Sequence, residues 1–167
     1  MKRFHAHVAV NDIAESIQFY TNLFNQKPKK EREDYAKWEL DEPQLNFAVS
    51  ARGHMPGLNH FGFQAENIIE LDELKKNAER ASPNNIVSEA GAACCYAKSD
   101  KHWTVDPQGI AWENFLTIAD GEDFGVDTHN QASACCIPLR TAVSDQIDAD
   151  HPCCLPTGSN AAQNCCG

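Results

Sequence analysis

An internal repeat constrains the fold of this chain more than any other feature. Residues 3–16 (RFHAHVAVNDIAES) align without a gap with residues 58–71 (LNHFGFQAENIIEL), so that His5 falls on His60 at an offset of 55 residues. Each copy reads as a short strand that ends at an Asp or Asn helix cap, with Glu three residues later, a variant of the capping box. A unit of this size cannot close a core alone, so the repeat predicts two copies of one supersecondary structure that pack together.

Apolar periodicity predicts one helix in each copy, over residues 13–24 and 68–81. Alternating apolar residues predict the strands that follow each helix: residues 35–41 and 44–50 in the first half, and residues 84–90, 94–100, 101–106 and 109–116 in the second. With two strand candidates after the first helix and four after the second, we interpret each half as a version of one βαβββ unit. We expect an α+β fold in which two βαβββ modules pair into a curved mixed sheet with a central metal cleft.

Composition divides the chain near residue 118. Residues 1–118 hold the repeat, as modules of about 1–54 and 55–118. Residues 119–167 contain seven acidic residues against one arginine, a net charge of −6 out of −10 for the whole chain, with few large apolar residues. Such a segment buries too little apolar surface to offset the entropy lost on ordering. We therefore expect residues 119–167 to form a disordered tail.

All eight cysteines occur as adjacent pairs, and only Cys94-Cys95 lies within residues 1–118. The tail carries the other three pairs: Cys135-Cys136, Cys153-Cys154 and Cys165-Cys166. This clustering differs from the spread cysteines of a disulfide scaffold and from the C-x2-C spacing of zinc sites. Adjacent thiols instead suit a soft, thiophilic ion.

Charge and hydropathy exclude some classes of protein. The acidic balance argues against a nucleic-acid binder, which needs a basic face. No stretch approaches the roughly 20 apolar residues of a membrane-spanning helix, and the N-terminus is too short and polar for a signal peptide. We expect a cytoplasmic protein, monomeric or homodimeric, without nucleic-acid or membrane partners.

The repeat also selects candidate metal ligands. His5 and His60 occupy matched positions on the opening strands of the two modules, and Glu113 lies among apolar neighbours on one face of the closing strand. These side chains could converge on the cleft between the modules. His7 points to the same side as His5 and stays an alternative ligand, although its repeat partner is Gly62, which has no side chain to bind a metal.

Several segments carry a family resemblance. The opening strand followed by VNDIAESIQFY, the second strand LNHFGFQ and the closing DPQGIAWENF resemble the vicinal oxygen chelate superfamily, which includes glyoxalases, extradiol dioxygenases and fosfomycin-resistance enzymes. DYAKWELDEPQLNFAVSARG, PGLNHFGFQ, CCYAKSDKHWTVDPQGIAWENF and the Cys-paired tail are similar to the bacterial carbon-arsenic lyases of organoarsenical resistance and the related cadmium-induced proteins. The resemblance covers about residues 3 to 118.

The resemblance implies a mononuclear Fe(II) site with His5, His60 and Glu113 as ligands, and a trivalent organoarsenical held by Cys94 and Cys95. Two imidazoles and one carboxylate leave positions on the metal open for dioxygen and substrate. The implied activity is that of a dioxygenase-type lyase. It would use dioxygen to cleave the carbon-arsenic bond of methylarsenite or reduced aromatic arsenicals and release arsenite.

Two details of the sequence bear on this activity. Adjacent strand residues point to opposite faces, so Cys94 and Cys95 can hold one arsenic only if the backbone is irregular, and we expect a loop at residues 91–93. The superfamily's four-ligand isomerases add a carboxylate from the first module. The counterpart of Glu113 falls within residues 46–49, none of which is acidic. This favours a three-ligand oxygenase.

Other functions stay open. The chain could be a cadmium- or arsenite-binding resistance protein without turnover, or a glyoxalase- or fosfomycin-resistance-like enzyme. The tail pairs could capture metal ions for the active site or belong to a poorly constrained extension. The organic group on arsenic and the physiological metal also stay open.

Overall fold

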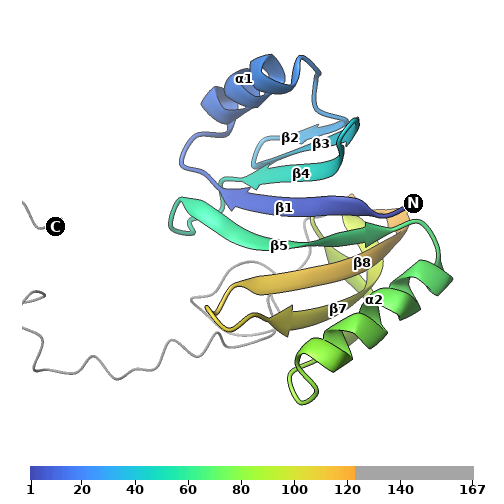
Figure 1. Ribbon diagram of the computed structural model, residues 1–167. Helices are drawn as coiled ribbons and strands as arrows, with labels where there is room; N and C mark the ends of the chain where they lie inside the picture. The colour runs from blue at the N-terminus through green and yellow to red at the C-terminus, as the bar shows by residue number, and fades with distance from the viewer. Residues whose placement is uncertain (123–167) are drawn as a thin grey trace, which may run out of the picture.

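The computed structural model describes residues 1–122, so the three tail cysteine pairs and the predicted disorder of the tail lie outside the described residues. The elements in chain order are β1 (Arg3–Ala9), α1 (Ile13–Phe24), β2 (Lys30–Arg32), β3 (Tyr35–Asp41), β4 (Gln44–Ser50), β5 (Gly57–Ala65), α2 (Ile68–Ala81), β6 (Val87–Cys94), β7 (Ala97–Val105) and β8 (Ala111–Asp120) (Figure 1). Each half is βαβββ, as predicted. No helix within residues 1–122 is long and apolar enough to cross a membrane.

The strands form one curved mixed sheet in the order β2-β3-β4-β1-β5-β8-β7-β6. The modules meet at its centre, where the opening strands β1 and β5 pair antiparallel. In each module the closing strand runs parallel to the opening strand, β4 beside β1 and β8 beside β5. The middle of the sheet therefore consists of the two opening strands side by side, with one closing strand on the outer side of each. This topology confirms the predicted α+β fold.

Both helices begin at the predicted residues because each has a side-chain cap. Asp12 Oδ1 accepts a hydrogen bond from the Glu15 N–H at 2.9 Å, and Asn67 Oδ1 accepts one from the Glu70 N–H at 3.0 Å. These bonds satisfy N–H groups that have no partner within the helix. The first helix stops at Asn25, whose φ of 50° is left-handed. The caps thus explain why the two helices start at the residues that the sequence predicts.

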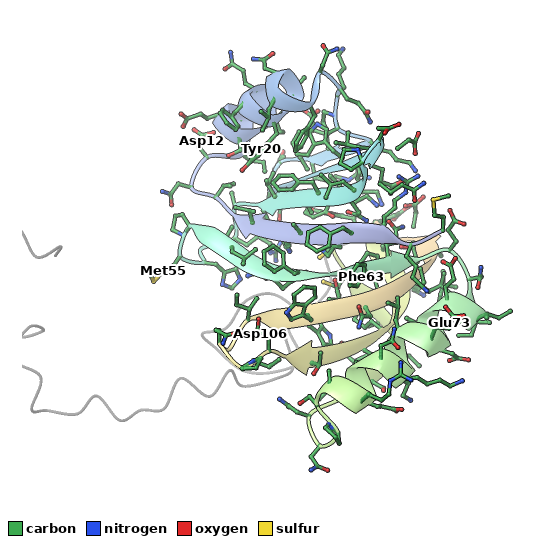
Figure 2. All side chains as sticks on the ribbon, in the orientation of Figure 1. Asp12, Tyr20, Met55, Phe63, Glu73 and Asp106 are labelled. Atoms are coloured by element: carbon green, nitrogen blue, oxygen red, sulfur yellow. The ribbon has the colours of Figure 1, made fainter. Side chains whose placement is uncertain are left out.

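The two helices cover one face of the sheet. α1 packs on β3 and β4, and α2 packs on β5, β7 and β8 (Figure 1). Tyr20 lies between α1 and the sheet (Figure 2), where its ring contacts Trp38 and Phe47 at centroid distances of 5.8 and 4.5 Å. Leu71 and Leu74 form the corresponding contact under α2. Because strand side chains alternate between faces, the neighbours of these core residues point to the opposite face of the sheet, where the candidate site lies.

The second module differs from the prediction in its β6–β7 hairpin. The sequence predicts separate strands over residues 94–100 and 101–106, but Ala97–Val105 is one strand, which begins after the turn at Cys95-Tyr96. The expected loop at residues 91–93 is part of β6, where a bulge lies between Glu89 and Ala92. The predictions were wrong because a bulge lets the pairing continue past Gly91, which reads locally as a loop residue.

The bounds of two other strands also differ from expectation. The sequence analysis did not predict β2, because Lys30–Arg32 has no apolar alternation and pairs only at the sheet edge. β8 continues to Asp120, two residues past the compositional boundary near 118. Lys30 Nζ contacts Asp120 Oδ1 at 2.6 Å, so a charge pair rather than apolar burial accompanies this last part of the strand.

Candidate metal centre

Three buried side chains from three central strands meet on the sheet face opposite the helices. His5 of β1, His60 of β5 and Glu113 of β8 offer ligand atoms that all lie within 4.8 Å of one another. His5 Nε2 lies 3.1 Å from His60 Nε2, and Glu113 Oε2 lies 3.3 Å from His60 Nε2 and 3.7 Å from His5 Nε2. The structure therefore brings together the two histidines that the repeat selected and the carboxylate that strand alternation selected.

Hydrogen bonds on the far side of each ring orient the two imidazoles. His5 Nδ1–H donates to the Asn46 carbonyl at 3.0 Å, and His60 Nδ1–H donates to Asn59 Oδ1 at 2.7 Å. With the proton on Nδ1, Nε2 carries the lone pair that binds a metal. Burial lowers the pKa of His5 to about 4, with the neighbouring His60 contributing, so His5 is neutral at physiological pH.

Glu113 forms a buried ion pair that the sequence analysis missed. Lys101 Nζ donates to Glu113 Oε1 at 2.7 Å, and the two residues are only 3% and 7% exposed. Burial alone would raise the pKa of Glu113, but nearby positive charge, chiefly that of Lys101, outweighs burial and holds this pKa well below 4.5. Glu113 is therefore ionised, as a ligand must be, with Oε2 turned toward the histidines. The sequence does contain one indication of this pair: Lys101 is two residues from Trp103 on the same strand, so its side chain points to the same face as that large apolar residue.

His7 lies beside this group and has a different partner. Its ring is 1% exposed and contacts the His60 ring at a centroid distance of 4.9 Å, but His7 Nε2 is hydrogen-bonded to Ser50 Oγ at 2.9 Å. Burial lowers the pKa of His7 well below 6.5, so this ring too is neutral. The geometry groups His5, rather than His7, with His60 and Glu113.

The strand register identifies the counterpart of Glu113 in the first module. His7 pairs with Ala48 across β1 and β4, and Gly62 pairs with Glu113 across β5 and β8. Because His7 and Gly62 are matched in the repeat, Ala48 occupies the position equivalent to Glu113. A methyl group offers no ligand. The first module therefore contributes no fourth carboxylate at this position.

The side chain of Cys94 packs in the space beside Ala48. Cys94 is 4% exposed and contacts Tyr35 and Ala48, while Cys95 is partly buried against the same cluster. The β6–β7 turn has positive φ at both central residues, 58° at Cys95 and 59° at Tyr96, as in a type I′ hairpin. This turn supplies the backbone irregularity that two adjacent thiols need to converge.

The sulfurs of the Cys pair lie close together and face the three ligands. Cys94 Sγ and Cys95 Sγ are 2.9 Å apart, and both residues line the cavity that also contains His5, His60 and Glu113. At this distance the two sulfurs are not bonded to each other, and the disulfide of Cys94 must be reduced before the pair can act as a dithiol. In the reduced protein one soft ion could contact both sulfurs at the edge of the candidate metal centre.

The donor set fits a ferrous ion. Two imidazoles and one carboxylate are the ligands of non-haem Fe(II) oxygenases. Two features together define the class of protein. Two βαβββ modules of one chain form a single sheet, and this donor set lies on the face of the sheet opposite the helices. Residues 2–113 match the Glyoxalase/Bleomycin resistance protein/Dioxygenase superfamily, and the chain belongs to that superfamily.

Relatives within the superfamily are similar over most of their length. The chain is 36% identical over 173 residues to a trivalent organoarsenical cleaving enzyme of Bacillus sp. (strain MD1), with 99% of each chain covered. It is 32% identical over 145 residues to the cadmium-induced protein CadI of Mycobacterium tuberculosis (strain ATCC 25618 / H37Rv), covering 81% of this chain and 93% of that one. The family resemblance of the sequence is therefore confirmed.

A solved structure supports the fold alone. Homoprotocatechuate 2,3-dioxygenase from Arthrobacter globiformis superposes with a TM-score of 0.53 at 17% sequence identity. The match covers 72% of this chain and 37% of that chain.

Proposed function

We propose that this protein is an Fe(II)-dependent, dioxygen-using lyase that cleaves the carbon-arsenic bond of trivalent organoarsenicals. The observation that carries the proposal is that the Cys94-Cys95 pair and the His5, His60 and Glu113 group line one cavity. Relatives named trivalent organoarsenical cleaving enzymes support it. Methylarsenite and reduced aromatic arsenicals are the proposed substrates, and arsenite is the proposed product.

The reduced Cys pair would bind the arsenic atom. Trivalent arsenic is soft and prefers thiolate to oxygen ligands. Two thiols replace the two hydroxyl groups of methylarsenite, and each thiol proton leaves with one hydroxyl group as water. The carbon-arsenic bond stays intact. The short Cys94 Sγ to Cys95 Sγ separation of 2.9 Å suits a single arsenic bound to both sulfurs. Binding through both sulfurs would hold the carbon-arsenic bond at a fixed position relative to the metal centre, which favours the reaction.

His5, His60 and Glu113 would hold the iron. When bound, ferrous iron supplies the activation of dioxygen. Lys101 occupies Glu113 Oε1 and leaves Oε2 directed to the histidines. Tyr35 and Phe115 form apolar walls of the cavity, and the buried ring of Trp103 contacts the His60 ring at a centroid distance of 5.2 Å.

The overall reaction is balanced with one dioxygen. For methylarsenite, the atoms of CH3As(OH)2 and O2 together equal those of formaldehyde and As(OH)3. The carbon-arsenic bond, one C–H bond and the O–O bond break. Carbon gains a double bond to one oxygen, and arsenic gains a hydroxyl group made of the other oxygen and the hydrogen that left carbon. Dioxygen accepts the four electrons that carbon loses. The requirement for reduced thiols and ferrous iron favours a cytoplasmic location.

A single-turnover experiment tests the proposal. The full chain is reduced, loaded with Fe(II) without oxygen and mixed with methylarsenite, after which air is admitted and arsenite is measured. We expect arsenite release that requires both iron and oxygen. Arsenic binding without release would instead identify a sequestering protein, and release without iron would overturn the metal assignment.

Variants separate the two groups of residues. We expect His60→Ala and Glu113→Ala to lose stoichiometric Fe(II) binding, whereas His7→Ala keeps most of it. We expect Cys94→Ser and Cys95→Ser to keep Fe(II) but lose most of the cleavage, because a hydroxyl is a harder and weaker ligand for arsenic. Normal Fe(II) binding by His5→Ala combined with its loss in His7→Ala would show that the ligand assignment is wrong.

A further inference from the structure

A second cavity lies on the helix-bearing face of the sheet. It has a volume of about 330 Å³ and lies between the C-terminal half of α2, the end of β7 and the start of β8. Figure 2 shows two of its lining residues, Phe63 on β5 and Asp106 at the turn before β8. Trp112 and Asn114 of β8 also line it, whereas Glu113 between them points to the metal centre. The sheet therefore separates the two cavities.

The walls of this cavity are apolar and partly aromatic. The rings of Phe63 and Trp112 lie nearly parallel, with an interplanar angle of 29° and a centroid distance of 6.2 Å. Leu74 and Ala78 of α2 face them across the cavity. Protein interiors are otherwise close-packed, and an apolar cavity of about 150 Å³ is already large enough for benzene. A space of about 330 Å³ therefore accommodates one or two aromatic rings.

Two buried polar atoms in the cavity walls lack a partner. Asn114 Oδ1 and Thr104 Oγ1 have no hydrogen bond within residues 1–122, and Asn114 is only 6% exposed. A buried acceptor without a donor is costly, and such atoms are uncommon in native proteins. Both residues come from neighbouring strands and line the same cavity. A ligand that brought a hydrogen-bond donor would satisfy Asn114 Oδ1.

The charges around the cavity favour a neutral ligand. Asp106 is its charged lining residue, but Asp106 Oδ1 accepts hydrogen bonds from the backbone N–H groups of Gln108 and Ile110, each at 2.9 Å. Trp112 Nε1 donates to the other carboxylate oxygen at 3.4 Å. The carboxylate is thus engaged within its own turn. The unpartnered acceptor at Asn114 is neutral and selects a hydroxyl or amino group rather than a cation.

We propose that this cavity binds a neutral aromatic molecule of one or two rings that carries one hydroxyl or amino donor, such as a phenol or an indole. The ring lies against Phe63 and Trp112, and the donor bonds to Asn114 Oδ1. This site is independent of the proposed function, because it lies on the opposite face of the sheet and uses neither the Cys pair nor the metal ligands.

Fluorine NMR on the full, reduced, metal-free chain tests the proposal with 4-fluorophenol and fluorobenzene as probes. We expect saturable binding of both, with 4-fluorophenol about tenfold tighter, as for one hydrogen bond to a buried acceptor. In Asn114→Leu, which keeps the volume but removes the acceptor, the two probes should bind equally. Equal binding of the two probes to the unaltered chain, or no saturable binding, would overturn the proposal.

Two further variants locate the bound probe. Ala78→Phe places a ring in the cavity and should abolish binding, whereas His60→Ala, on the opposite face, should leave it unchanged. Binding that survives Ala78→Phe, or that disappears in His60→Ala, would overturn the assignment to this cavity. Thr104→Val is the control for a change in the cavity wall, because it keeps the shape of the side chain and leaves the Asn114 acceptor in place. 4-Fluorophenol should still bind to this variant and should still be displaced by indole.

Discussion

At the scale of single residues, the candidate metal centre is a set of buried charges that depend on one another. Lys101 and Glu113 are both almost fully buried, and each is the partner that makes burial of the other tolerable. Removing one member of such a pair leaves an uncompensated charge, which is far more costly than the pair itself. The same ion pair keeps one carboxylate oxygen away from the two imidazoles.

Replacing Lys101 tests this dependence. We expect Lys101→Met to lower the free energy of unfolding of the metal-free protein by about 3 kcal/mol, because Glu113 loses its counter-charge. Fe(II) should restore much of this loss, since the metal then neutralises the carboxylate. Urea unfolding with and without Fe(II) measures both values.

The matched control is Lys98→Met, which alters an exposed lysine on the same strand. We expect this variant to change the free energy of unfolding by less than about 0.5 kcal/mol. If Fe(II) stabilised Lys101→Met no more than the unaltered chain, the assigned role of the ion pair would be wrong.

The buried histidines predict a pH dependence of stability in the metal-free protein. Burial holds the pKa of His5 at about 4 and that of His7 well below 6.5, whereas both pKa values return to about 6.5 on unfolding. Between about pH 6.5 and about pH 4.5 the unfolded chain therefore binds protons that the folded chain does not, and stability falls as pH falls. Each histidine contributes a slope of up to about 1.4 kcal/mol per pH unit.

Urea unfolding across this window measures the slope, and His7→Gln removes one of the two groups without adding a charge. We expect the slope to decrease by about one half in this variant. An unchanged slope would show that His7 titrates normally in the folded protein.

At the scale of elements, two features of the strands position the site. The Cys95-Tyr96 turn has positive φ at two non-glycine residues, and tertiary contacts hold it there: the Tyr96 hydroxyl donates to Asp34 Oδ1 at 2.6 Å. That hydrogen bond raises the pKa of Tyr96 to about 12. The other feature is the close contact of β5 with β8, where Gly62 pairs with Glu113.

Gly62→Ala tests the second feature. A Cβ at this position would lie 1.6 Å from the Glu113 carbonyl oxygen, so one of the two central strands must move. We expect a loss of about 3 kcal/mol or more in the free energy of unfolding, with weaker Fe(II) binding because Glu113 moves with β8. Thermal unfolding and iron titration measure the two effects.

Gly53→Ala serves as the control, because nothing lies within 4 Å of the added Cβ and only its φ of 80° opposes it. We expect a cost of about 1 kcal/mol and normal iron binding. Equal costs at both positions would mean that the strand contact is not the cause.

At the scale of the whole molecule, the site belongs to neither module alone. The first module supplies His5, and the second supplies His60, Glu113 and the Cys pair. All of these lie within residues 1–122, before the first of the tail cysteines.

Truncation tests the tail. We expect residues 1–125 to unfold cooperatively and, when reduced and loaded with Fe(II), to cleave saturating methylarsenite at the rate of the full chain. Replacing all six tail cysteines should lower activity only at limiting substrate, because thiols on a disordered tail, as the sequence predicts, would raise the local arsenic concentration without fixing a distance to the iron. Loss of cooperative unfolding, or loss of saturated turnover, would show that the tail is part of the working domain.

The sequence by itself determined the repeated βαβββ architecture, both helices with their caps, and the matched His5 and His60. These are local patterns: a hydrogen bond from the Glu15 N–H to Asp12 Oδ1 and an apolar period of 3.6 need no distant partner. Strand alternation also placed Glu113 among inward-facing residues. Local patterns were thus enough to select the candidate ligands.

Only the tertiary structure decided which side chains are partners. The ion pair of Lys101 with Glu113, the contact of His7 with Ser50 and the equivalence of Ala48 and Glu113 all depend on strand register, which joins residues far apart in the chain. A shift of one residue would turn each of these side chains to the other face. Register is set by packing of the whole sheet, and so no local pattern contains it.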